Sequence, residues 1–404
     1  MPFEPAAQML GHFTKVAVSE ATARRVTEKS GESYVAVQQQ QLVALEEELP
    51  QVVVGPAVQQ VSVDGAYVPL RGPAQWAEVK TLAIGTVMEP VLNREGEWEV
   101  HTRELSYFSR LADHETFGRL ATVETHRRGT EKAGVVCGVV DGAEWEQKFL
   151  DLHRPDAVRI LDWRHATEYL VKAGQAGLGS GTAAASEWLG VQLRELRHGD
   201  PEKVLERLRS LKEALARAGP LELPPGEGLK VVAGSLEYLE KRKEQIRYAE
   251  FASQGYPIGS GAVESANKLV VEARLKGSGM HWAREHVDPM VALRNIACSD
   301  RWEEAWPQIK ERLRQQNRER AQQRRTGRRG AKALLVEEAL PVHGEPVADQ
   351  PAGMAALAVQ TIPPEADPKP SLGPRPPAAN HPWRHMPIGR ARTIPARCLI
   401  GAER

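Results

Sequence analysis

The chain has 404 residues and a formal net charge of zero, and 41% of its residues are hydrophobic. That length suffices for two or three domains with a substantial core, and the sequence shows neither an apolar run long enough to cross a bilayer nor a signal-peptide pattern. Cys137, Cys298 and Cys398 lie far apart, which argues against a disulfide framework or a zinc knuckle. We therefore expect a cytoplasmic protein with no membrane partner.

Residues 1–50 are predicted to form a helical N-terminal region. Helical patterns occupy residues 4–13 and 19–30, and Ser19 suits the N-cap of the second helix. This pair fits a partial helix-turn-helix or an ordinary helical hairpin. A further helix is expected over residues 34–49, and Gly55-Pro56 marks the boundary with the next region.

The segment 56–163 has the pattern of an α/β core. Strands are predicted at 58–64, 78–88, 102–111, 133–140 and 157–161, with helices at 113–129 and 143–152. The first strand ends at Asp64, and the apolar strand 133–140 is followed by Asp141. Each aspartate precedes a glycine, and an Asp-Gly pair alone is an ordinary turn signal.

A third carboxylate comes from a predicted helix start. The turn Tyr256-Pro257-Ile258-Gly259-Ser260-Gly261 stops the preceding element, and an amphipathic run then continues to Leu275 with Glu264 in its first turn. A glutamate there also complements the helix dipole, so Glu264 alone says little. Together, Asp64, Asp141 and Glu264 could converge on Mg²⁺ or Mn²⁺, which prefer oxygen ligands and serve phosphoryl transfer when bound as a pair.

The remaining segments differ in character. Residues 164–255 carry helical periodicity, interrupted by a Pro-rich loop at 219–226. A basic helix is predicted over 307–340, where ten Lys and Arg residues between Lys310 and Lys332 outnumber two glutamates; such a stretch either neutralises DNA phosphates or forms a solvated helix. Residues 341–404 hold thirteen of the 28 prolines, which predicts a disordered tail.

Several separated motifs resemble one known family. They are Val63-Asp64-Gly65-Ala66-Tyr67-Val68-Pro69, Trp76-Ala77-Glu78-Val79-Lys80, Val140-Asp141-Gly142-Ala143-Glu144-Trp145 and Arg274-Leu275-Lys276-Gly277-Ser278-Gly279-Met280-His281-Trp282. In this order they resemble bacterial insertion-sequence transposases of the ISKra type, which belong to the DDE group with an RNase H-like core. The resemblance covers about residues 5–306 and recurs at His381-Pro382-Trp383-Arg384.

The resemblance implies a fold class and an activity. The fold would be an α/β, RNase H-like mixed sheet, with three antiparallel strands before two parallel ones, over residues 56–163 and 256–306, the latter carrying the final helix. An all-helical insertion would fill 164–255. The activity would be metal-dependent cleavage and strand transfer of DNA by a nucleoid-associated homo-oligomer bound to element ends and target. Asp64, Asp141 and Glu264 would hold the metal.

The resemblance also suggests DNA contacts. Lys268, Arg274, Lys276 and Trp282 would hold DNA near Glu264, although Lys268 could instead pair with Glu264 and Trp282 could belong to the core. The basic stretch would add phosphate contacts from Arg324, Arg325, Arg328 and Arg329. Relative to the family the N-terminus looks short. A non-catalytic DNA-binding derivative is therefore an alternative, whereas a carboxylate-pair sugar hydrolase is disfavoured by the 5% aromatic content.

Asp162 also follows a predicted strand and competes with Asp141 for the role of second acid. In an RNase H-like sheet the Asp162 strand would lie one strand further from Asp64, and strands are about 4.8 Å apart, so roughly 10 Å would separate the two aspartates. Asp162-X-X-His165 resembles the auxiliary motif that follows the second acid in related transposases. We therefore choose Asp141 and assign Asp162 and His165 auxiliary roles beside the metal or the DNA.

Overall fold

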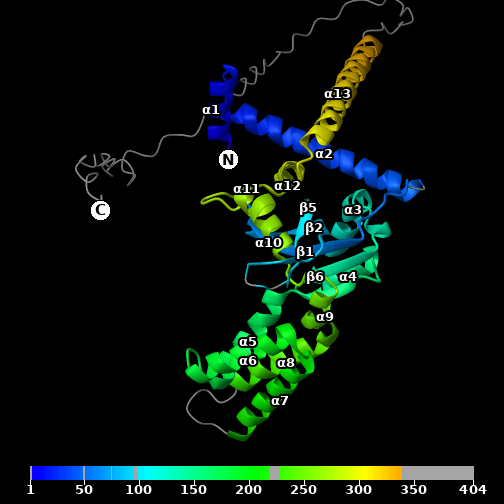
Figure 1. The fold of residues 1–404 in the computed structure, drawn as a ribbon. Coiled ribbons are helices and arrows are strands. Elements are labelled where there is room, and N and C mark those ends of the chain that lie inside the picture. The colour runs from blue at the N-terminus through cyan, green and yellow to red at the C-terminus, as the bar shows by residue number, and fades with distance from the viewer. Residues whose placement is uncertain are drawn as a thin grey trace, which may run out of the picture. The chain divides into compact units, whose positions relative to one another are not determined.

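The computed structural model describes residues 2–48, 51–73, 75–94, 96, 98–218 and 227–338, with side chains up to Thr326 in the last helix (Figure 1). Residues Met1–Glu337 form one compact unit. The loop predicted at 219–226, the tail predicted at 341–404 and Cys398 lie outside the described residues. No described helix is both long and apolar enough to cross a membrane.

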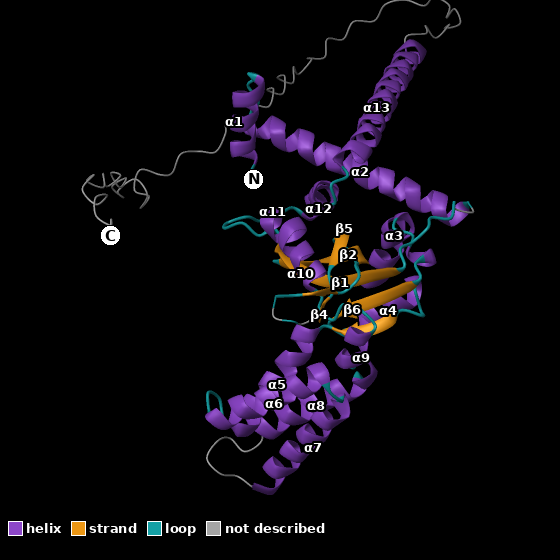
Figure 2. Cartoon of the chain, viewed as in Figure 1, coloured by secondary structure: helices purple, strands orange, loops and turns teal. Residues whose placement is uncertain are grey.

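A five-stranded mixed sheet lies at the centre of this unit, so the α/β class is confirmed (Figure 2). Its order is β5 (Thr102–Arg110), β2 (Trp76–Val87), β1 (Val58–Pro69), β6 (Val135–Val140) and β7 (Val158–Leu161). β2 runs antiparallel to both β1 and β5, whereas β6 is parallel to β1 and β7 is parallel to β6. All five predicted strands are present. The two-residue strands β3 (Val91–Leu92) and β4 (Trp98–Glu99) pair in a hairpin that the sequence did not predict.

The two faces of the sheet are covered by different helices. On one face, α3 (His114–Arg127) and α4 (Glu144–His153) bury Phe117 and Phe149 against Leu82 and Ile84. On the other, α10 (Gly261–Ala266), a π-helical segment (Asn267–Glu272), α11 (Ala273–Leu275) and α12 (Arg284–Cys298) pack on Val68 and neighbouring side chains. The predicted helical run to Leu275 is present with a π-helical middle. Beyond this run, the segment 256–306 contains a further helix, α12, which the sequence did not predict.

The helical segment after β7 contains α5 (Trp163–Leu178), α6 (Ala183–His198), α7 (Pro201–Ala218), α8 (Glu227–Lys241) and α9 (Tyr248–Ser253). Its side chains form one buried cluster with residues of β6 and β7, including Leu205, Leu208 and Leu236. On α7 the spacing of Leu205, Leu208 and Leu211 at three residues is that of an apolar helix face. The helical prediction for this segment is therefore confirmed over its described part.

The helices at the two ends of the compact unit differ from the prediction. After α1 (Phe3–Thr14), the separate helices expected at 19–30 and 34–49 are one continuous helix, α2 (Glu20–Glu47), whose N-cap is Ser19 as predicted. Gly31 lies within α2 and does not break it. The residue is glycine because α2 packs closely on α12 there: a Cβ at position 31 would come 2.2 Å from the Pro289 carbonyl oxygen. α13 (Trp302–Glu338) starts five residues before the basic helix predicted from 307 and contains Pro307.

Candidate active site

Asp64 and Asp141 lie level with each other on neighbouring parallel strands. The β1–β6 register pairs Val58 with Val135 and Val61 with Gly138, and three residues further along both strands it reaches Asp64 and Asp141. Level residues on adjacent strands are about 4.8 Å apart at the backbone. The β6–β7 register places Asp162 level with Asp141, one strand beyond it. The sheet therefore presents a row of three aspartates, of which the first two are adjacent.

The helix that carries Glu264 is attached directly to Asp64. Asp64 is interior to β1, and the Asn267 side-chain amide, one turn after Glu264, donates a hydrogen bond of 2.7 Å to its Oδ2. The Gly65 amide donates to its Oδ1 at 2.6 Å. Asn267 is 6% exposed, and its Oδ1 has no hydrogen-bond partner within the described part of the chain. A buried oxygen ligand with spare capacity thus lies beside the first acid.

The helical segment after β7 holds the second acid in place. The Tyr238 hydroxyl donates to the carbonyl oxygen of Asp141, and the Arg242 side chain, just beyond α8, donates to the carbonyl oxygen of Gly142 at 2.5 and 3.2 Å. Gly142 has φ +82°, and a Cβ there would lie 2.4 Å from Arg242 Nε. Only glycine fits this turn without strain. The Asp141-Gly142 turn is therefore fixed by residues about 100 positions later.

Mutual repulsion and burial raise the proton affinity of these acids. The pKa of Asp141 is raised to about 7, chiefly by burial and then by the charges of Asp64, Asp162 and Glu264. Burial also raises the pKa of Asp64, against the hydrogen bonds from Gly65 and Asn267. A third buried acid, Glu146 in the first turn of α4, has its pKa raised to about 8 by burial and by Asp141, and it accepts a hydrogen bond from the Ala143 amide. Crowded carboxylates of this kind favour either protons or a cation.

Glu264 does not pair with Lys268. It accepts a hydrogen bond of 3.0 Å from Arg164, whose side chain is 67% exposed, while Lys268 is solvent-exposed. Its charge contributes to the raised pKa values of both Asp64 and Asp141, so the three acids lie within electrostatic range of one another. Within the described residues, however, no group of three or more His, Cys, Asp or Glu side chains is arranged closely enough to hold a metal ion.

Asp162 uses its carboxylate to fix the backbone. It is 3% exposed, its Oδ2 accepts from the His165 amide at 2.9 Å as the N-cap of α5, and its Oδ1 accepts from the Ser260 amide at 2.6 Å. Ser260 is the N-cap residue of α10, so Asp162 positions the helix start that carries Glu264. Both carboxylate oxygens of Asp162 already accept hydrogen bonds from the backbone, whereas the Asp141 side chain is 38% exposed. Asp141 is therefore the better candidate for the second acid.

His165 lies beside Asp141, close enough to form an ion pair when its imidazole is protonated. Its Nδ1 is 3.8 Å from Asp141 Oδ2, beyond hydrogen-bond distance, and burial lowers the pKa of the imidazole. The ring contacts Tyr169 and Tyr238, which stack on each other with centroids 3.9 Å apart. These rings hold the imidazole at the edge of the acidic site.

The residues predicted to contact DNA fall into separate environments. Lys276 is exposed and pairs with Glu272 at 2.7 Å, whereas Arg274 is 7% exposed. Trp282 is 8% exposed, and its indole N–H donates to the Leu275 carbonyl oxygen, so the core alternative for this residue is correct. Arg324 and Arg325 are exposed on α13; Arg328 and Arg329 continue that helix, with side chains outside the described set.

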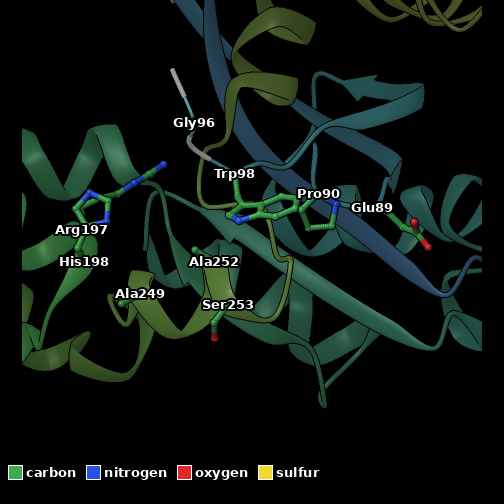
Figure 3. A pocket seen from close by; sticks show the side chains of 9 residues that line it. All are labelled: Glu89, Pro90, Gly96, Trp98, Arg197, His198, Ala249, Ala252 and Ser253. Atoms are coloured by element: carbon green, nitrogen blue, oxygen red, sulfur yellow. The ribbon is translucent and has the colours of Figure 1, made fainter. Parts of the chain in front are cut away.

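Two adjoining cavities lie beside the β3–β4 hairpin, one of which is drawn in Figure 3, and the other reaches the start of α10. The larger, of about 760 Å³, has the 67%-exposed Trp98 of β4 across its middle, with Arg197 and His198 from the end of α6 on one side and Pro90 on the other. The smaller, of about 510 Å³, shares Trp98 and Arg197 and extends to Gly259, Gly261 and Ser265, next to Glu264. Neither cavity is lined by Asp64, Asp141 or Glu264; because the two share Trp98 and Arg197, they form one groove that ends at the start of α10.

Four residues of the site were not predicted: Glu146, Tyr238, Arg242 and Asn267. Only Asn267 has a signal in the sequence, its position one helical turn after Glu264, because the other three act through tertiary contacts or burial. Neither comparison, with models of known protein families or with curated proteins, finds a match to this chain.

Proposed function

We propose that the protein is a DDE-type transposase that cuts DNA and transfers the freed strand. The observation that carries the proposal is the parallel register that sets Asp64 beside Asp141, with the Glu264 helix bonded to Asp64 through Asn267. The strand order, with β5, β2 and β1 antiparallel and β6 and β7 parallel to β1, is the arrangement expected of an RNase H-like core.

The donor atoms around Asp64 and Asp141 have the chemistry that a hard divalent cation prefers. All the candidate donors are oxygens, from Asp64, Asp141, Glu264 and the unpartnered Asn267 Oδ1, and such sets suit Mg²⁺ or Mn²⁺. When bound, the cation would supply charge neutralisation and activate the attacking oxygen. Because Glu264 is paired with Arg164, a change of partner would be needed to bring it to the other two acids.

The chain's own residues would orient the reacting strand. Asp162 holds the start of α10, and Tyr238 and Arg242 hold the Asp141 turn, so the helix of Glu264 and the turn of Asp141 are fixed by two different segments. In the groove, Trp98 offers an exposed ring on which an unpaired base can stack, and Arg197 supplies a positive charge for the backbone. We further propose that the protein binds double-stranded DNA as a homo-oligomer and is nucleoid-associated.

The test is a strand-cleavage assay with duplexes taken from the DNA that flanks the gene for this chain, in the presence of Mg²⁺ or Mn²⁺. Asp64→Asn, Asp141→Asn and Glu264→Gln are each expected to abolish cleavage and leave DNA binding intact, because the amide keeps the shape but removes the ligand charge. Asp151→Asn, on the opposite-face helix α4, is the matched control and should cleave normally. DNA binding without cleavage by the unaltered protein would support the non-catalytic alternative instead.

A further inference from the structure

Arg274 is a buried cation that lacks a full set of partners. Its guanidinium lies between two rings, with its carbon 4.5 Å from the Phe3 centroid and 4.9 Å from that of Trp282. Its Nη2 is buried and donates to no acceptor among the described residues. Stacking on aromatic rings offsets part of the cost of desolvating a cation, but an unpaired buried N–H remains costly.

A cavity of about 520 Å³ opens at this guanidinium. Its lining includes four basic side chains and one acid, which are Arg24, Arg71, Arg274, His281 and Glu20. Arg24 already donates to Glu28 at 2.8 Å, whereas Arg71 is solvent-exposed beside the cavity. The lining therefore carries an excess of positive charge and suits an anion.

The walls of the cavity are fixed by backbone hydrogen bonds. The Arg71 amide donates to the Trp282 carbonyl oxygen at 2.8 Å, and the Trp282 amide donates to that of Pro69 at 3.0 Å. Phe3 comes from α1 and Arg24 from α2, so the cavity lies where the N-terminal helices meet the segment after α11. A site held in this way is formed before its ligand arrives, which lowers the entropic cost of binding.

We propose that this cavity is a phosphate-binding site that holds one backbone phosphate of the DNA. The identification of the phosphate as DNA rests on the proposed function; the preference for a phosphate oxyanion rests on the planar N–H donors of Arg274 and the nearby Arg71. The phosphate accepts the hydrogen bond that Arg274 Nη2 lacks. The site thereby couples the N-terminal helices to the end of the helical run that carries Glu264.

The first experiment measures DNA affinity against salt concentration in EDTA, so that cleavage plays no part. Arg274→Met and Arg71→Gln are each expected to reduce the slope of log K against log salt by about 1, the loss of one phosphate contact. Arg274→Lys should retain most of the slope. Arg217→Gln, a 77%-exposed arginine paired with Glu213 on α7, is the matched control and should leave the slope unchanged.

The second experiment asks whether inorganic phosphate alone binds. Replacing chloride by phosphate at equal ionic strength should raise the melting temperature of the unaltered protein and of Arg217→Gln, and raise it less for Arg274→Met and Arg71→Gln. Circular dichroism checks that each variant is folded. If the slope of log K against log salt is unchanged in folded Arg274→Met and Arg71→Gln, the cavity does not hold a DNA phosphate. If phosphate raises the melting temperature equally in all variants, the cavity is not a phosphate-binding site. Neither result depends on strand cleavage, so the proposed function is tested separately.

Discussion

Replacing Asp141 or Asp162 by asparagine should change the stability of the protein in opposite directions. Both aspartates lie at the ends of neighbouring strands, but their environments differ: Asp141 is close to other acids and has a pKa raised to about 7, whereas Asp162 accepts two backbone N–H bonds. An amide at position 141 relieves charge repulsion. An amide at position 162 can accept one of the two bonds and turns its own NH₂ group toward the other donor.

The structure sets the expected magnitudes. For Asp162→Asn, one unsatisfied backbone donor in a site that is 3% exposed costs about 1–3 kcal/mol of the free energy of unfolding. For Asp141→Asn, each pKa unit corresponds to about 1.4 kcal/mol, but the side chain is 38% exposed and solvent screens much of the effect. We therefore expect a gain of roughly 1 kcal/mol at pH 7.5 without divalent cations.

Urea denaturation in EDTA at pH 7.5 measures both changes, with Asp151→Asn on α4 as the near-neutral control. The midpoint should rise for Asp141→Asn and fall for Asp162→Asn at an unchanged m-value. In the cleavage assay Asp141→Asn should be inactive, whereas Asp162→Asn should retain reduced activity through a less well positioned Glu264. A destabilised Asp141→Asn together with a stability-neutral Asp162→Asn would refute the assignment of the two roles.

Two further predictions concern pH and the basic helix. In EDTA, the free energy of unfolding should fall as the pH rises from 6.5 to 8. The raised pKa values of Asp141 (about 7) and Glu146 (about 8) keep protons on the folded protein that the unfolded chain has already released, and the folded protein loses them over this range. Thermal melts measure the fall, which Mg²⁺ but not NaCl should reduce. Below pH 6.5 the lowered pKa of His153 (about 4) acts in the opposite direction. Truncation before Lys310 should flatten the salt dependence of DNA binding equally for gene-flanking and scrambled duplexes; selective loss of flanking-DNA binding would show that this stretch reads sequence.

The sequence by itself determined the strands and most helices of this protein. Period-two and apolar runs marked β1 and β6, and Ser19 marked the start of α2, because these signals act within a few residues. The same local patterns placed Asp141 after a strand and Glu264 in the first turn of a helix, but they ended the first strand at Asp64, which lies inside β1. They also misplaced a helix boundary at Gly31, whose role depends on its contact with Pro289 across the helix pair.

Only the tertiary structure decided which of these residues meet. The parallel register aligns Asp64 with Asp141, and the bond from Asp162 to Ser260 spans 98 positions, so no local pattern carries either fact. Burial likewise placed Arg274 between two rings and decided for Trp282 the core alternative that the sequence had left open. Local propensity fixes where an element begins, whereas the solvent exposure and pairing of its side chains depend on segments that pack against it from elsewhere in the chain.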